Sequence, residues 1–530
     1  MLGLELVVAL GAAVVLGSIA AERIRANAPV VLLLSGVLLS FIPVFRNVGL
    51  PPEIVLLLFL PALLYWESLT TSLRTIRTYI RGIMLSATLL VLATAATVAA
   101  VAHALGLDWG PAWVIGAAVA PTDATAVAAL GRSLPHRQIA VLRAESLVND
   151  GMALVIYGVV VSSVVGVAAT GFLQVPAFLL VAGQFVYSFA GGVAVGLGIG
   201  WILIEARRRI SNPLYGNAGT LLTPFIAFLG AELIHASAVL AVVACGLYIA
   251  HASPLAISAF TRQQTGAVWT LVTFLLNGAL FVLVGLQLPA VIGGLTSVAL
   301  GQALLIAAAV YVTTILARFG FLVLSAYIIR AIDRRPYQRT LRTTNRARLV
   351  SSFAGFRGAV SLAVALSIPE GPEFPARDTI VFITAFVVVA SLVIQGIALP
   401  KVIRWAHIPV DTSAAEELVL AKRISSEEAF SAMPTIAREL GIADDVLDRV
   451  RAEYEEHVSA MAAALDGNED DPVVVRSRQY AELRLALIAQ KRATVVRLRD
   501  TRVIDDAVLR QIQAQLDVEE VRLARPQQSE

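Results

Sequence analysis

The chain has 530 residues, of which 58% are hydrophobic and only 15% are charged, and its mean hydropathy is +0.78. This composition excludes an ordinary soluble enzyme and predicts a protein that lives in a lipid bilayer. The formal net charge is only +3, and nothing supports nucleic-acid binding. The single cysteine, Cys245, excludes an internal disulfide and a cysteine-based metal cage, and we expect no cofactor.

Apolar segments follow one another from Leu4 to about Arg404. The first of them lacks a basic start and a small-residue cleavage site, so we expect a retained helix rather than a signal peptide. A hydrocarbon core of about 30 Å sets the length that each segment needs to cross it. The sequence predicts about thirteen transmembrane helices in a domain of residues 1–405, at 4–22, 29–43, 51–68, 80–103, 111–132, 139–163, 174–204, 217–233, 236–252, 267–288, 299–329, 349–368 and 378–403.

Basic residues alternate with these spans. Cytoplasmic loops of membrane proteins carry most of the lysine and arginine. The loops after even-numbered spans hold only Arg46 and Arg377. The loops after odd-numbered spans hold the others, namely Arg23, Arg25, Arg74, Arg77, Arg81, Arg132, Arg137, Arg207, Arg208, Arg209, Arg262, Arg330, Arg334, Arg335, Arg339, Arg342, Arg346 and Arg348. We therefore expect the N-terminus outside and the C-terminal tail in the cytoplasm.

The count of spans and two interrupted helices predict an inverted repeat. Thirteen spans divide into six, one linker and six, so the fifth span would correspond to the twelfth. The fifth has Pro121 at mid-membrane, and the twelfth has Gly355 and Gly358 on either side of Arg357. Glycine and proline are common in transmembrane helices, but paired interruptions in corresponding positions predict an ion site near the midplane.

The sixth span contains the stretch AESLVNDGMALVIY, with two acids and an amide. Asp150 lies about 16 Å into the bilayer, close to the midplane. An ionised carboxylate at that depth is costly unless it is paired or bound to a cation. On a helix, Ser146 and Asp150 share a face, whereas Glu145 and Asp150 point about 140° apart. The two acids therefore serve different neighbours.

Two arginines inside the spans are candidate partners for these acids. A buried guanidinium stays charged and must be paired. We expect Glu145 and Arg357 to form an ion pair that holds helices together. Arg318, in the eleventh span, is the other candidate, and the sequence leaves its partner open.

Two further acids have apolar neighbours. Asp123 follows Pro121 in the fifth span, and Glu67 lies in LPALLYWESL near the inner end of the third. The apolar helices offer too few cations to pair with every acid, so we expect Asp150 and Asp123 to contact an ion. Glu67 could contact the ion or reach water.

Four of these motifs together resemble the cation:proton antiporter family, in its sodium/proton exchanger branch (NhaP-like). The motifs are PTDATA in the fifth span, ESLVND in the sixth, GFRGAVSLAVAL in the twelfth and LPALLYWESL in the third. They occur in the expected order on the expected helices, and the resemblance spans about residues 1–405. It implies an all-α fold of inverted six-helix repeats with crossing broken helices, a homodimer, and the exchange of Na⁺ for H⁺.

The resemblance also implies roles for particular residues. Asp150 would be the carboxylate that binds cation and proton in turn, with Asn149 as its neutral neighbour. A cation cage would be completed by Ser146, Thr122 through its carbonyl, Asp123 and Glu67. In the same way the family pattern would pair Glu145 with Arg357.

Oxygen ligands from carboxylates, a hydroxyl and a carbonyl suit a small hard cation such as Na⁺ or Li⁺. Competition of this cation with a proton at Asp150 predicts an antiporter rather than an enzyme. Family members that move net charge carry two adjacent acids where this chain has Asn149 and Asp150, and a lysine on the broken partner helix where it has Arg357. Because neither Asn149 nor Arg357 titrates in practice, the resemblance implies that one cation exchanges for one proton without net charge movement. Asp123 and Glu67 are further carboxylates that could take up a proton during the cycle. A K⁺/H⁺ antiporter and a cation channel remain alternatives. A carrier of organic anions would need basic groups at the break to bind its substrate. Arg357 is the only basic residue there, and we expect Glu145 to pair with it, so this alternative is disfavoured.

Composition changes abruptly after the membrane domain. Residues 406–530 alternate acidic and basic residues with Leu, Val and Ala at helical spacing, as in ADDVLDRVRAEYEEH. This pattern predicts a helical cytoplasmic tail with a regulatory or dimer-contact role. Abundant Arg and Ala are typical of GC-rich bacterial genomes, so we expect a bacterial plasma membrane protein.

Overall fold

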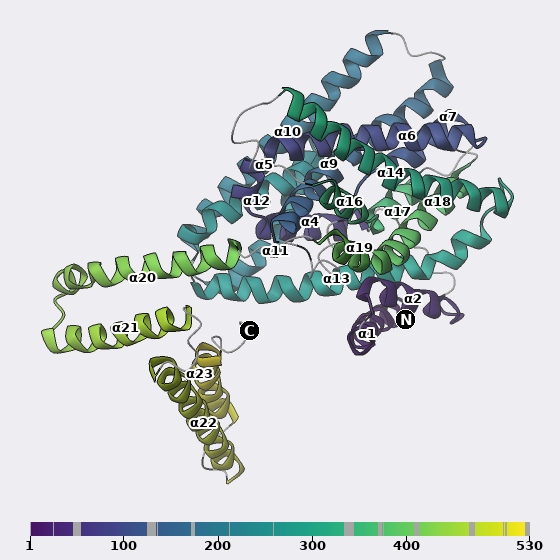
Figure 1. Ribbon diagram of the computed structural model, residues 1–530. Helices are drawn as coiled ribbons and strands as arrows, with labels where there is room; N and C mark the ends of the chain where they lie inside the picture. The colour runs from purple at the N-terminus through teal and green to yellow at the C-terminus, as the bar shows by residue number, and fades with distance from the viewer. Residues whose placement is uncertain are drawn as a thin grey trace. The chain divides into compact units, whose positions relative to one another are not determined.

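The computed structural model describes residues 2–24, 26–45, 55–123, 134, 136–170, 175–210, 212–257, 259–332, 344–368, 374, 376–407, 413–465, 472–501, 503 and 506–524. The chain divides into two compact units, Met1–Val410 and Asp411–Glu530. Throughout the described residues the regular structure is helical, as the composition predicts (Figure 1).

The first unit holds the apolar helices. In chain order they are α1 (Leu2–Arg23), α2 (Ala28–Ser40), η1 (Val55–Phe59), α4 (Leu60–Thr70), α5 (Leu73–Leu85), η2 (Ser86–Leu90), α6 (Val91–Ala104), α7 (Trp109–Val119), α9 (His136–Thr170), α10 (Val175–Arg209), α11 (Pro213–Glu232), α12 (Ala238–Ala256), α13 (Ala259–Gly293), α14 (Leu300–Ile332), α16 (Asn345–Phe353), α17 (Ala359–Leu366), α18 (Arg377–Ala390), η4 (Ser391–Gln395) and α19 (Gly396–Ala406).

Eight stretches of the described chain are long and apolar enough to cross a membrane, namely Leu4–Arg23, Ile76–Ala104, Gln138–Val161, Val186–Arg209, Leu214–Glu232, Thr261–Gly293, Leu300–Ala331 and Arg377–Ala406. Shorter apolar helices cover Ala28–Ser40, Val55–Thr70, Trp109–Val119 and Ala238–Pro254. The total of thirteen spans and their inverted repeat remain predictions.

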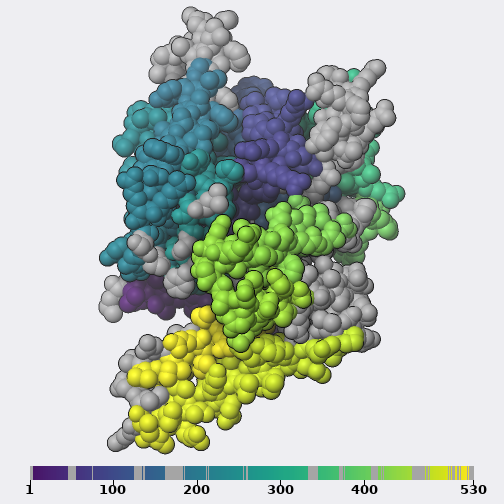
Figure 2. Space-filling view, turned by 90° about the vertical axis from the view of Figure 1, so that its left-hand side faces the viewer, coloured from purple at the N-terminus to yellow at the C-terminus, as the bar shows by residue number. Residues whose placement is uncertain are grey.

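These helices pack as two bundles. The site bundle consists of α5, α6, α7, α9, α14 and α16 to α19, and the wall bundle consists of α1, α2, α4 and α10 to α13. The interior of the site bundle is filled by branched and aromatic side chains such as Val98, Ile115, Ile306 and Ile383. The two bundles meet where α9, α17 and α18 contact α4, α12 and α13. Figure 2 shows the closely packed side chains on one face of the unit, including the blue-green surface of the α10 region.

Buried aromatic rings join two helices of the wall bundle. Trp66 on α4 stacks on Trp269 of α13 with ring centroids 6.1 Å apart and an interplanar angle of 8°. Tyr65 lies 5.3 Å from the same ring at 52°. Trp269 is 1% exposed and Tyr65 is completely buried. Such aromatic contacts stabilise the pair beyond the area that they bury, so α4 and α13 are held in one register.

The second unit is helical and rich in charge. It contains α20 (Ser413–Leu440), α21 (Asp444–Leu465), α22 (Pro472–Asp500) and α23 (Asp506–Ala524). Arg492 of α22 lies 2.6 Å from Asp517 and 2.5 Å from Glu520 of α23. These exposed ion pairs orient the two helices and contribute little stability, because water and salt screen them.

Candidate functional site

The end of α7 touches the break between α16 and α17. Helix α7 ends at Val119, and residues 121–123 are non-helical. Helices α16 and α17 are separated by a non-helical segment at residues 354–358. The backbone N–H of Asp123 donates to the carbonyl of Phe356 at 2.8 Å. The break expected in the twelfth span is therefore present, whereas the second half of the fifth span lies outside the described residues.

Gly358 gives Asp123 the space that it occupies. A Cβ added at Gly358 would lie 2.7 Å from both Cβ and Cγ of Asp123, and closer still to Oδ2. No side chain fits at that distance, so glycine is needed for the carboxylate to approach the N-terminal end of α17. The positive end of the helix dipole of α17 favours a negative charge there.

Side chains of helix α9 bind the non-helical segment 121–123 after α7. The hydroxyl of Ser146 donates to the carbonyl of Thr122 at 2.5 Å, and Nδ2 of Asn149 donates to Oγ1 of Thr122 at 3.2 Å. The first bond satisfies a carbonyl that has no helical partner beyond the end of α7, and the second fixes the side chain of Thr122. Asp150, one residue further along α9, is 8% exposed.

A small cavity lies at these breaks. Its lining includes Glu67, Thr122, Asp123, Ser146 and Asp150, which are the residues that the sequence predicts to bind an ion. The three carboxylates are Glu67 of α4, Asp123 of the non-helical segment after α7, and Asp150 of α9. Within the described residues no three acidic, histidine or cysteine side chains converge closely enough to hold a metal ion by themselves. Hydroxyl and carbonyl oxygens would have to complete any cation site.

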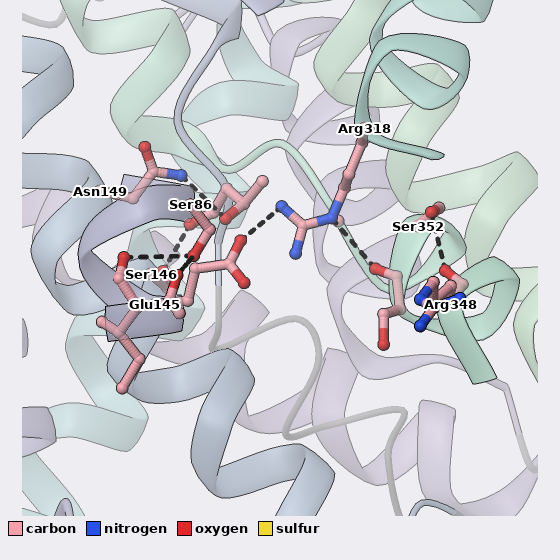
Figure 3. A network of polar contacts seen from close by, with 12 residues as sticks. Ser86, Glu145, Ser146, Asn149, Arg318, Arg348 and Ser352 are labelled. Carbon is pink, nitrogen blue, oxygen red and sulfur yellow. Dashed lines mark hydrogen bonds and ion pairs between the residues drawn. The ribbon is translucent and has the colours of Figure 1, made fainter. Parts of the chain in front are cut away.

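The prediction of an ion pair between Glu145 and Arg357 is wrong in the structure. Oε1 of Glu145 lies 2.7 Å from Nη1 of Arg318, and the two side chains are 6% and 3% exposed. Arg318 also donates from Nε to the carbonyl of Ser351 at 3.1 Å, near the C-terminal end of α16. Figure 3 shows Glu145 and Arg318 pointing toward one another from opposite sides. Arg318, whose partner the sequence leaves open, is thus the partner of Glu145.

Arg357 has a different environment. Its Nε donates to the carbonyl of Val119, the last residue of α7, and its Nη1 donates to the carbonyl of Gly355 at 2.8 Å. Its backbone N–H donates to the hydroxyl of Ser391 at 3.1 Å. The last carbonyls of a helix lack helical partners and carry partial negative charge, which favours a cation. Arg357 therefore caps the end of α7 at the crossing.

Two polar residues of the cavity were missed in the sequence. Asn277 of α13 and Ser361 of α17 also line it. Asn277 is a lone amide in the apolar stretch FLLNGAL, and Ser361 lies inside the motif GFRGAVSLAVAL. The amide was the signal that could have drawn attention to α13.

A broken membrane helix beside an acid-lined cavity is typical of secondary ion transporters. The chain belongs to the sodium/hydrogen exchanger transmembrane family, whose profile matches residues 9–405. The resemblance seen in its motifs is thereby confirmed.

Relatives and solved structures agree with this assignment. The chain is 43% identical to an uncharacterised Na⁺/H⁺ exchanger of Mycobacterium tuberculosis, over 100% of this chain and 97% of that protein. It is 31% identical to a sodium, potassium, lithium and rubidium/H⁺ antiporter of Bacillus subtilis, over 70% of this chain and 57% of that protein. The structure of the sodium proton antiporter MjNhaP1 from Methanocaldococcus jannaschii has the same fold, with a TM-score of 0.59 at 18% identity, over 76% of this chain and 99% of that one.

Proposed function

We propose that the chain exchanges one monovalent cation, sodium or lithium, for one proton by competition at Asp150. The observation that carries this proposal is the cavity in which Asp150 lies with Asp123, Glu67, Ser146 and Thr122. Each of these residues offers an oxygen, and oxygen ligands are those that small hard cations prefer.

Burial makes the competition obligatory. Asp150 is 8% exposed in a membrane helix, and an ionised carboxylate there needs a neutralising charge. A bound proton and a bound cation each supply that charge, but only one of them is needed at a time. A cavity that opens to one side of the membrane and then to the other would convert this competition into antiport.

The neighbours of Asp150 support exchange without net charge movement. Asn149 cannot titrate, and its amide is already bound to Thr122 at 3.2 Å. Arg357, which caps α7 through the carbonyl of Val119, keeps its charge in both states because a guanidinium does not deprotonate in proteins. The proposal assigns the exchanged proton to Asp150 alone, so that Asp123 and Glu67, the other two carboxylates of the cavity, keep their protonation state through the cycle.

Further parts of the proposal concern the setting of the protein. We place the transport domain at residues 1–405 in the plasma membrane of a bacterium, as a homodimer, with the N-terminus outside. Residues 406–530 form its cytoplasmic tail. The name of the Bacillus relative includes potassium beside sodium, which keeps K⁺/H⁺ exchange as the second candidate. A cation channel is the third, and it would conduct without a counter-transported proton.

Proton flux in proteoliposomes tests the proposal. Purified protein should show proton movement driven by gradients of Na⁺ or Li⁺, with K⁺ as the comparison. Asp150→Asn should abolish this flux because the variant keeps the shape and loses the titrating charge. Asp108→Asn is the matched control, since Asp108 is exposed and lies outside the cavity. Retained flux in Asp150→Asn would remove Asp150 from its role.

Stoichiometry is tested by the condition at which flux vanishes. For one-for-one exchange, flux stops when the sodium and proton ratios across the membrane match, whatever voltage is imposed with potassium and valinomycin. A null point that moves with voltage would mean that a second proton or cation is carried. The one-carboxylate mechanism would then have to be abandoned.

A further inference from the structure

The cavity at the crossing has two unlike walls. The site bundle contributes its polar side, with Thr122, Asp123, Ser146, Asp150 and Ser361. The wall bundle contributes an apolar side, made of Leu60, Leu63 and Leu64 of α4 and Leu280 and Phe281 of α13. Two polar residues interrupt this apolar side. They are Glu67, already considered, and Asn277.

Asn277 places an amide in this apolar side, half-buried and accessible from the cavity. It is half-buried within α13, between Leu276 and Gly278, in a helix that is otherwise apolar over several turns. Its side chain makes no hydrogen bond to any residue in the described ranges, while other polar side chains of α13 do. Thr273, for example, bonds to the carbonyl of Trp269 at 2.7 Å. An amide in an apolar wall costs free energy unless it has a polar partner.

The aromatic contacts of α4 and α13 bring Asn277 and Glu67 to the same cavity. Glu67 directly follows Trp66, and Asn277 lies about two helical turns after Trp269. Because the rings of Trp66 and Trp269 are stacked, the two helices cannot slide past one another without losing this contact. The wall bundle therefore presents a carboxylate and an amide together.

We propose that the amide oxygen of Asn277 is a ligand of the transported cation and sets the preference among Na⁺, Li⁺ and K⁺. This inference rests on the proposed function. A neutral oxygen binds a hard cation without titrating, so it adds affinity and leaves the exchange ratio unchanged. Its fixed place on α13 limits the size of the ion that can touch it and the carboxylates at once.

Three variants test the role of Asn277. Asn277→Leu keeps the branched shape of the side chain and removes the oxygen. Asn277→Asp keeps the oxygen and serves if the leucine variant does not fold. Asn217→Leu is the matched control, since Asn217 is an amide of α11 that bonds to Gln264 and Thr265, at 2.9 and 2.6 Å, outside the cavity. The assay is proton flux in proteoliposomes over a series of Na⁺, Li⁺ and K⁺ concentrations, with thermal stability in detergent measured in parallel.

The expected result is a change in cation affinity. In Asn277→Leu the apparent KM for Na⁺ should rise about tenfold, the size expected when one polar contact is lost, and the ratios of KM among the three cations should change. In Asn277→Asp the KM for Na⁺ should stay at or below that of the wild type. In Asn217→Leu the ratios should equal those of the wild type.

Two outcomes would overturn the inference. The first is a folded Asn277→Leu protein whose KM values and cation order match the wild type. The second is a rise in KM for Asn277→Asp as large as that for Asn277→Leu. Failure of the proposed function itself has a different signature, because the wild type would then show no cation-driven proton flux or Asp150→Asn would retain it.

Discussion

Removal of the Glu145 carboxylate tests the ion pair that the structure assigns to Arg318. Glu145→Ala leaves the guanidinium of Arg318 buried, at 3% exposure, with the carbonyl of Ser351 as a remaining partner. We expect the variant to be folded at low temperature but much less stable than the wild type. Apparent cation affinity should change little, because Glu145 is not among the residues that line the cavity.

The magnitude follows from the geometry. The nitrogen and oxygen of the pair are 2.7 Å apart. Charge centres about 4 Å apart attract by about 4 kcal/mol at an effective dielectric constant of about 20. Breaking a buried pair by removal of one partner costs about 3–5 kcal/mol, since a buried charge is left without compensation. We therefore expect the free energy of unfolding to fall by about 3–5 kcal/mol.

The assay is unfolding of the purified protein in mixed detergent and SDS micelles. Glu145→Ala, Arg318→Ala and the double variant form one double-mutant cycle, and Glu145→Ala with Arg357→Ala forms another. The first cycle should show a coupling of about 1–3 kcal/mol, because the two residues are in contact. The double variant of that cycle should be less destabilised than the sum of the two single variants, by the amount of this coupling.

A second cycle with larger coupling than the first would refute the assignment. It would mean that Glu145 pairs with Arg357, as the family pattern implies, and that Arg318 has another partner. Additive effects in both cycles would show that Glu145 forms no stabilising ion pair with either arginine.

Three other substitutions have expected outcomes. Gly358→Ala should reduce exchange more than tenfold, because its methyl group would collide with Asp123, whereas Gly320→Ala, which has open space around it, should match the wild type. Asp123→Asn should raise the apparent KM for Na⁺ in the same flux assay, and an unchanged KM would place Asp123 outside the cation site. Asp378→Ala removes the acceptor of the Ser297 backbone N–H, at 2.8 Å, so hydrogen exchange of that amide should become about tenfold faster. Equal exchange rates would show that the α13–α14 loop is held by other contacts.

Much of this protein was predictable from the sequence because the signals are local. Hydropathy over about twenty residues indicates a membrane helix, whatever the rest of the chain does. Pro121 and the glycines around Arg357 predict breaks because each residue acts on its own turn of helix. Acids at mid-membrane are rare, so their depth alone makes Asp123 and Asp150 candidates for one site.

Other features depend on which helices are neighbours and how each is rotated. Arg318 and Arg357 are both buried arginines, and nothing in their local sequence says which one faces Glu145. The structure brings Arg318 to Glu145 and uses Arg357 to cap α7. Likewise, Asn277 is one polar residue in an apolar helix until the stacked tryptophans of α4 and α13 bring it to the cavity. The sequence alone determined which residues cannot stay in a bilayer without partners, because that cost depends on the residue and its depth. Only the tertiary structure decided which residue partners each of these buried polar groups, because a contact between helices distant in sequence depends on their packing and rotation.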